Sequence, residues 1–148
     1  MTSPHSPTVL IVETTTAERC PHDFLGDSSD LIYFISFAHA ERYGADHSLA
    51  HAARIMKRRL RIDLSPLLRF ADARAEDAAE ARLLETIWQD PEPVARAALA
   101  TAQAIDDNDD LRTLTSAFPE LPQRLRELAA IASWATCQGA RIRLTYAL

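Results

Sequence analysis

Glycine and lysine are scarce in this chain of 148 residues. Three glycines are too few for a glycine-rich phosphate-binding loop, and so few flexible positions favour regular secondary structure. Lysine occurs once, at Lys57, against 15 arginines. Alanine, the best helix former, occurs 26 times, so the composition predicts a mainly helical protein. The alanine- and arginine-rich usage is also typical of a GC-rich coding sequence and suggests a bacterial source.

Long apolar runs and a targeting signal are also missing. The longest uncharged apolar stretch, residues 31–40, is far shorter than the roughly 20 residues of a membrane-spanning helix. The first residues lack the positive region of a secretory signal. Cys20 and Cys137 lie far apart in the sequence, and we expect both thiols to be reduced. These features predict a cytoplasmic protein without a membrane partner.

Basic residues are outnumbered by acidic ones, which leaves a net charge of −5. A general nucleic-acid-binding protein is normally basic, so the composition argues against nucleic acid as a partner of the chain as a whole. Apolar residues make up 47%, close to the average for globular proteins. Because we find no repeat and no linker, we expect residues 1–148 to form a single helical domain, in which residues 1–7 are a flexible arm.

Segments with strand character lie near both ends of the chain. Residues 8–16, TVLIVETTT, are rich in β-branched residues and predict a strand. Residues 140–148, ARIRLTYAL, alternate between apolar and polar side chains and predict a half-buried strand. An isolated two-stranded ribbon is marginally stable, so we expect the strands to pair and to pack on helices. A homodimer that joins two ribbons into a four-stranded sheet is a further hypothesis.

Helix signals fill the region between these strands. Apolar periodicity and capping residues predict helices over residues 30–43, 47–61, 66–89, 94–105, 111–118 and 122–137. The first is apolar on almost every face, so we expect it to be the central buried helix. The predicted fold class is mainly α: a bundle of five to six helices with the N- and C-terminal strands paired as a short ribbon.

The second predicted helix, with Asp46 as its N-cap, divides into an apolar face and a basic face. At 100° per residue, its basic side chains fall together: His47, His51, Arg54 and Arg58, with Lys57 and Arg61 beside them. The guanidinium group of arginine binds phosphate or carboxylate through two parallel hydrogen bonds, and histidines add positive charge that depends on pH. We therefore predict that this stripe binds an anionic ligand or a protein partner. The alternatives are a solvated face, or internal pairing with the acidic residues 106–110.

His47 and His51 also have the i,i+4 spacing of helical metal sites. The glutamate of zinc-protease motifs is missing between them, and Arg54 and Arg58 on the same face disfavour a divalent cation. Candidates for a third ligand are Cys20, His22 and His39. We therefore expect no metal and no cofactor, and a metal- or cofactor-binding bundle is an alternative hypothesis.

The segment Arg42-Tyr-Gly-Ala-Asp-His47 resembles the Arg-x(4–6)-His motif of small helical ribonucleases of the HEPN type. In that family a small polar residue usually follows the arginine, whereas Tyr43 follows here and Gly44 interrupts the helix. The resemblance implies a nuclease-like enzyme that uses Arg42 and His47, as an alternative function. The main prediction is a non-enzymatic binding or regulatory protein, and the sequence leaves open whether the protein is an enzyme.

Overall fold

The computed structural model describes residues 9–40 and 47–147, which form a mainly helical protein with one small sheet. The elements are β1 (Val9–Thr14), α1 (Ser29–His39), α2 (Ser48–Arg58), the 3-10 helix η1 (Ser65–Leu68), β2 (Phe70–Asp72), α3 (Ala78–Thr86), α4 (Pro91–Asp107), α5 (Asp109–Leu114), α6 (Leu121–Cys137) and β3 (Ile142–Ala147). The predicted N-terminal arm over residues 1–7 lies outside the described residues. No described helix has the length and apolar character needed to cross a membrane.

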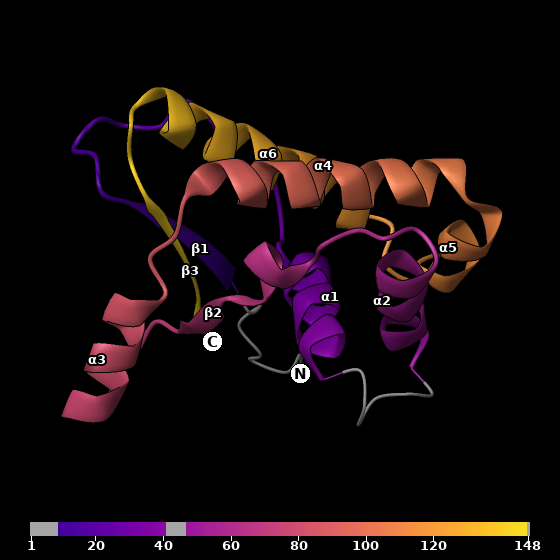
Figure 1. Ribbon diagram of the computed structural model, residues 1–148, viewed down its shortest axis with the longest axis horizontal. Coiled ribbons are helices and arrows are strands. Elements are labelled where there is room, and N and C mark those ends of the chain that lie inside the picture. Colours follow the sequence, from indigo (N-terminus) through magenta and orange to yellow (C-terminus); the bar gives the residue numbers. More distant parts are fainter. Residues whose placement is uncertain (1–8, 41–46, 148) are drawn as a thin grey trace, which may run out of the picture.

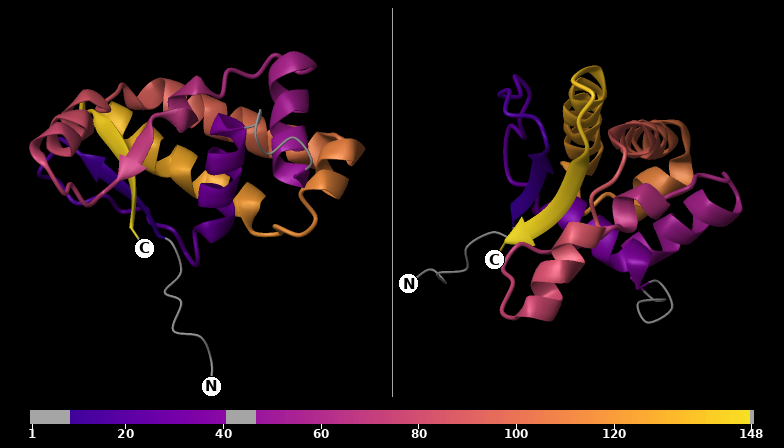
Figure 2. Two further views of the ribbon diagram at one scale, coloured as in Figure 1. Left: turned by 90° about the horizontal axis from the view of Figure 1, so that it is seen from below. Right: turned by 60° about the vertical axis from the view of Figure 1, so that its left-hand side comes forward.

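The long helices α4 and α6 lie side by side and run in opposite directions (Figure 1). Helices α1 and α2 lie below them, and the sheet stands at one end of the molecule. Figure 2 shows the same arrangement from two further sides, with α3 projecting near the sheet. Alanines such as Ala98 and Ala132 are fully buried in the two long helices, and such small side chains allow close approach of the helix axes.

Strand β3 is the centre of the sheet, whose order is β1-β3-β2. β1 runs antiparallel to β3, with Val9 opposite Ala147 and Thr14 opposite Ile142, so the two terminal strands pair as predicted. The sheet is nevertheless more than a ribbon, because β2 adds to the other edge of β3 in parallel. Gln89 extends that edge by bridging to Ile142. The result is a three-stranded mixed sheet.

The prediction of one long helix over residues 66–89 is wrong. This region contains η1, strand β2 and the short helix α3 instead. Asp77 starts α3, because its carboxylate accepts a hydrogen bond from the Glu80 N–H at 2.8 Å. The backbone of β2 pairs with β3, which satisfies groups that a continuous helix would satisfy internally.

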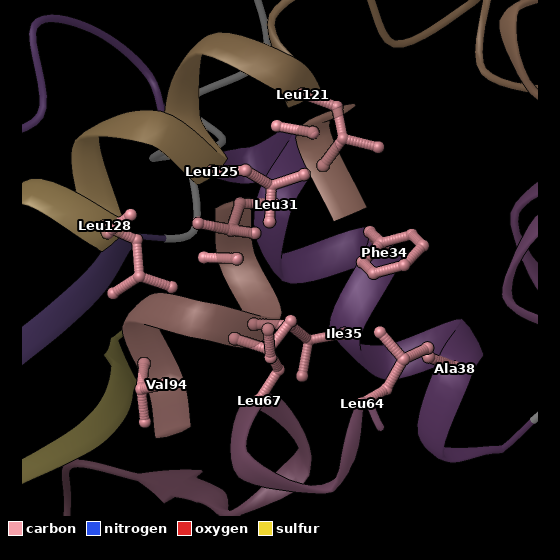
Figure 3. Close-up of a cluster of buried hydrophobic side chains, with 14 of the residues drawn as sticks. Leu31, Phe34, Ile35, Ala38, Leu64, Leu67, Val94, Leu121, Leu125 and Leu128 are labelled. Atoms are coloured by element: carbon pink, nitrogen blue, oxygen red, sulfur yellow. The ribbon is translucent and has the colours of Figure 1, made fainter. Parts of the chain in front are cut away.

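The hydrophobic core forms where α1, η1, α4 and α6 meet (Figure 3). Leu31, Leu67 and Leu125 are 0% exposed and come from three of these elements. Phe34 is also fully buried. Helix α1 is therefore central and largely buried, although Tyr33 is 45% exposed.

Ser28 joins the start of α1 to β1. It occupies the N-cap position of α1, but its side chain makes no capping hydrogen bond. Its hydroxyl oxygen accepts a hydrogen bond from the Leu10 N–H at 2.9 Å instead. A buried backbone N–H of the edge strand is thereby satisfied by a side chain that lies outside the sheet.

A buried ion pair holds the segment before α1 against α6. The side chains of Arg124 and Glu127 are each 7% exposed and hydrogen-bonded to each other. Arg124 also donates to the Asp27 carbonyl at 3.2 Å, and Glu127 accepts from the Leu25 N–H at 3.3 Å. A Cβ at Gly26 would lie 2.8 Å from Nη2 of Arg124, so any other residue there would displace the guanidinium.

Two carboxyl groups near this ion pair have pKa values shifted in opposite directions. Desolvation by burial is the main cause that raises the pKa of Asp30 above its ordinary value of 3.8. Burial also acts to raise the pKa of Glu127, but hydrogen bonds from Arg124, Gln123 and the Leu25 N–H outweigh it and lower that pKa below 4.5. Ionised Glu127 therefore stabilises the fold above about pH 4.5, whereas ionised Asp30 opposes it.

We predict that Leu125→Ala lowers the free energy of unfolding by about 2–5 kcal/mol, because it leaves a cavity among fully buried side chains. The matched control is Leu99→Ala on α4, where the side chain is 51% exposed and the expected change is within about 0.5 kcal/mol. Chemical denaturation measures both values. Equal losses for the two variants would contradict the position of the core.

We predict that Glu127→Gln lowers the free energy of unfolding at pH 7 by roughly 3 kcal/mol or more, because it leaves the Arg124 charge buried with a weaker partner. The loss should begin to shrink as the pH falls below about 4.5, where Glu127 of the unfolded chain becomes protonated, and should be smallest below the lowered pKa of Glu127 in the folded protein. In the control, Asp30→Asn should leave stability at pH 7 unchanged or raised, because it removes an ionised group that burial disfavours. Chemical denaturation from pH 3 to pH 7 measures how the stability of each variant changes relative to the wild type. Parallel pH profiles for the two variants would refute the opposite pKa shifts of Glu127 and Asp30.

Candidate functional site

Helix α2 buries one face and presents the other to solvent. Leu49 and Met56 are fully buried, as are the alanines between them on the same seam. His51 and Arg58 are exposed, and Arg54 is half-buried. The structure therefore places three of the four predicted binding residues along the outer face of α2, and their role in binding stays a prediction.

His47, the fourth predicted binding residue, has a structural role at the start of α2. It is the N-cap of the helix, in place of the predicted Asp46, which lies outside the described residues. The Nδ1 atom of His47 accepts a hydrogen bond from the Leu49 N–H at 3.0 Å. The imidazole also stacks on Phe37, with ring centroids 3.7 Å apart and planes 10° apart.

Lys57 links α2 to the end of α1. Its ammonium group donates a hydrogen bond to the Ala38 carbonyl at 2.9 Å. The last carbonyl groups of a helix lack partners within the helix and carry partial negative charge, so a cation there is favourable. Lys57 therefore contributes to helix packing at the side of the basic face.

The basic surface continues beyond the last turn of α2. Arg59 and Arg61 are both exposed. Arg61 has a left-handed backbone, with φ of 57°, which costs a residue other than glycine roughly 1–2 kcal/mol. Together with Arg96 and Asp63, Arg61 lines a surface hollow of about 300 Å³ beside α4. We name the set His51, Arg54, Arg58, Arg59 and Arg61 the α2 basic surface.

Three of the acidic residues 106–110, which the sequence suggested as internal partners for this surface, contact residues outside it. Asp106 forms an ion pair with Arg126, and Asp109 forms one with Arg112. Asp107 accepts a hydrogen bond from Gln103 at 2.9 Å. These contacts lie within α4, within α5, and between α4 and α6, so these acidic side chains are local partners of those helices.

The three candidates for a third metal ligand, Cys20, His22 and His39, are divided between two hollows. The His22 N–H donates to Sγ of Cys20 at 3.4 Å, and both residues line a hollow of about 450 Å³ beside β1. His39 instead contacts Phe70 edge-on, with ring centroids 6.3 Å apart. Within residues 9–40 and 47–147, no group of three or more His, Cys, Asp or Glu side chains is placed to hold a metal. Arg42, the other half of the nuclease-like motif, lies outside the described residues.

A third hollow, with a polar lining, was not predicted from the sequence. It has a volume of about 450 Å³ and lies where the end of α1, strands β2 and β3, and α3 meet. Its charged lining includes Asp72, Arg74, Glu76 and Glu80. The hollow could not be predicted because residues 66–89 were predicted to form one continuous helix, without β2. The pattern Asp77-Ala-Ala-Glu80 was the available signal, because an acidic N-cap followed by Glu three residues later marks a helix start.

Comparisons with protein-family models, curated proteins and solved structures give no match to this chain. The functional interpretation therefore rests on the contacts, burial and charges of its own residues. Two surfaces stand out on that basis: the α2 basic surface and the acidic hollow beside β2.

We predict that His47→Ala lowers the free energy of unfolding by roughly 1–3 kcal/mol, because both the helix cap and the ring stack are lost. His47→Asn separates the two contributions, since asparagine is a good N-cap that cannot stack on Phe37. Its expected loss is smaller, about 0.5–1.5 kcal/mol. Chemical denaturation of both variants measures the difference, and equal losses would show that the cap contributes nothing.

Proposed function

We propose that the protein is a non-enzymatic binding protein whose α2 basic surface recognises an acidic segment of a partner protein. One observation supports this most strongly: arginines and one histidine occupy a solvent-facing surface on a helix whose opposite face is fully buried. The buried face fixes the orientation of the helix, so the charged side chains have a defined position. The chain as a whole is acidic, with a net charge of −5, so this positive surface is a local feature.

Arginine suits this role better than lysine would. A guanidinium group offers a planar fork of donors that matches the two oxygens of a carboxylate. Arg54, Arg58 and Arg61 present such groups within eight residues of sequence. His51 lies one helical turn from Arg54 on the same outer face. A partner segment with several Asp or Glu residues has complementary charge and geometry.

An acidic protein segment fits the remaining charge distribution better than nucleic acid. A phosphate backbone is long and uniformly charged, and it would extend from the basic surface onto the acidic remainder of the protein. A short acidic peptide would contact the basic surface alone. The left-handed backbone at Arg61 also supports binding, because strained backbone often occurs at functional sites.

Poly-L-glutamate is a suitable probe of this proposal. We predict that the protein binds it with an affinity that falls as salt rises, because exposed charges are screened over about 8–10 Å at ordinary ionic strength. Arg54→Gln/Arg58→Gln should weaken binding roughly 2- to 30-fold, since each exposed ion pair is worth about 0.2–1 kcal/mol. Fluorescence anisotropy of labelled poly-L-glutamate measures the affinities.

The matched control is Arg19→Gln/Arg82→Gln, which removes the same charge from two exposed arginines outside the α2 basic surface. This control should bind as the wild type does. Equal weakening by both double variants would mean that net charge alone drives binding, and the proposal would fail. Tighter binding to single-stranded RNA than to poly-L-glutamate would show that the partner class is wrong.

A further inference from the structure

The outer edge of β2 carries backbone groups that point away from the sheet. The Ala73 N–H donates to the Tyr146 carbonyl at 2.9 Å, and Ala71 lies opposite Thr145 in the parallel ladder. Along a strand, successive residues direct their N–H and C=O groups to opposite edges. The backbone groups of Phe70 and Asp72 therefore point outward, where no strand of the described residues pairs with them.

The two edges of the sheet differ in this respect. At the β1 edge, the hydroxyl of Ser28 already occupies the outward Leu10 N–H. Beside β2, two hollows of about 450 and 440 Å³ share Asp72, Arg74 and Glu76 in their linings, so open space continues along this edge. The β2 edge therefore offers a further strand two outward residues, Phe70 and Asp72, with open space beside them.

Helix α3 forms an apolar wall next to this edge. It has no buried residue, and Leu83, which lines the larger hollow, is 52% exposed. Leu84 lines the same hollow, as do the rings of Phe70 and Tyr146, whose centroids are 5.6 Å apart. A helix that buries no side chain against its own protein gains little from packing. An apolar side chain placed between α3 and β2 would contact both elements.

Negative charge surrounds this apolar wall. Three carboxylates, Asp72, Glu76 and Glu80, line the larger hollow with a single guanidinium, Arg74. All four residues are exposed. The excess of carboxylates favours a ligand that carries lysine or arginine next to its apolar side chains.

We propose that the groove between β2 and α3 binds an extended basic segment of a partner protein by strand addition. The segment pairs with the outward backbone groups of Phe70 and Asp72. Its apolar side chains pack against Leu83, Phe70 and Tyr146, and its basic side chains contact Glu76 and Glu80. Backbone pairing supplies affinity and the alternating side chains supply selectivity, as in other cases of β-augmentation. This site is separate from the α2 basic surface, which lies at the other end of the molecule (Figure 1).

A short peptide of alternating valine and lysine is the probe. We expect the wild-type protein to bind it in isothermal titration calorimetry, and Glu76→Gln/Glu80→Gln to weaken binding roughly 2- to 30-fold. Glutamine keeps an oxygen that can accept the Glu76 N–H, which Glu80 accepts at 2.6 Å in the wild type, so α3 should still form. The control Glu18→Gln/Asp110→Asn removes the same charge from two exposed sites elsewhere and should bind as the wild type does.

The backbone component is tested on the peptide, so that the fold of the protein is untouched. The same peptide with N-methylated backbone amides cannot donate hydrogen bonds, and we expect its binding to be lost. Undiminished binding of the N-methylated peptide would refute strand addition. Absence of binding by the unmodified peptide at about 1 mM would refute the site, because even a weak interaction is detectable there. A dimer in sedimentation experiments that Asp72→Lys dissociates would show that a second copy of this chain occupies the groove instead, which would overturn the proposed partner.

Discussion

The structure depends on the backbone pairing of one strand, β3, with three distant segments. Residues 9–14 pair along one edge of β3, and residues 70–72 and Gln89 pair along the other. Ile142 and Leu144 on the same strand are fully buried in the core, so the strand also joins the sheet to the helices. Each of these pairings closes a long loop of chain, which costs entropy before any contact stabilises it. Pairings between segments that are remote in sequence generally form slowly during folding.

The predictions from sequence were most accurate where a local pattern and the tertiary contacts agree. Strict alternation over residues 140–148 predicted β3, and the helix predicted over residues 94–105 lies within α4, which begins three residues earlier, after its N-cap Asp90. Gly139, with φ of 65°, follows α6 as expected for a left-handed residue after a helix. In these places one physical cause determines both the pattern and the structure.

The errors occur where a distant partner decides the outcome. Phe70-Ala-Asp is too short to show alternation, and it forms a strand because β3 offers an edge. His47 caps α2 although Asp46 precedes it, since stacking on Phe37 holds the ring at the helix start. The face of α2 that carries His51, Arg54 and Arg58 was predicted from helix geometry alone. The hollow beside β2 could not be predicted, because residues 70–72 line it as part of a strand and had been predicted to be helical.

The charged groups of the molecule have two different uses. The buried pair of Arg124 and Glu127 fixes a loop against α6, and its removal would affect the fold. Apart from the half-buried Arg54, the α2 basic surface and the carboxylates beside β2 are exposed, and exposed ion pairs contribute little to stability.

Residues 73–88 leave the edge of β3 after β2 and return to the same edge at Gln89. Both ends of this segment pair with one strand. The segment contains α3, which contributes no buried side chain. Its length and sequence are therefore nearly independent of the core. Residues 73–88 should therefore tolerate evolutionary change and the insertion of a foreign peptide or a reporter domain, because a longer connection adds only a small entropic cost.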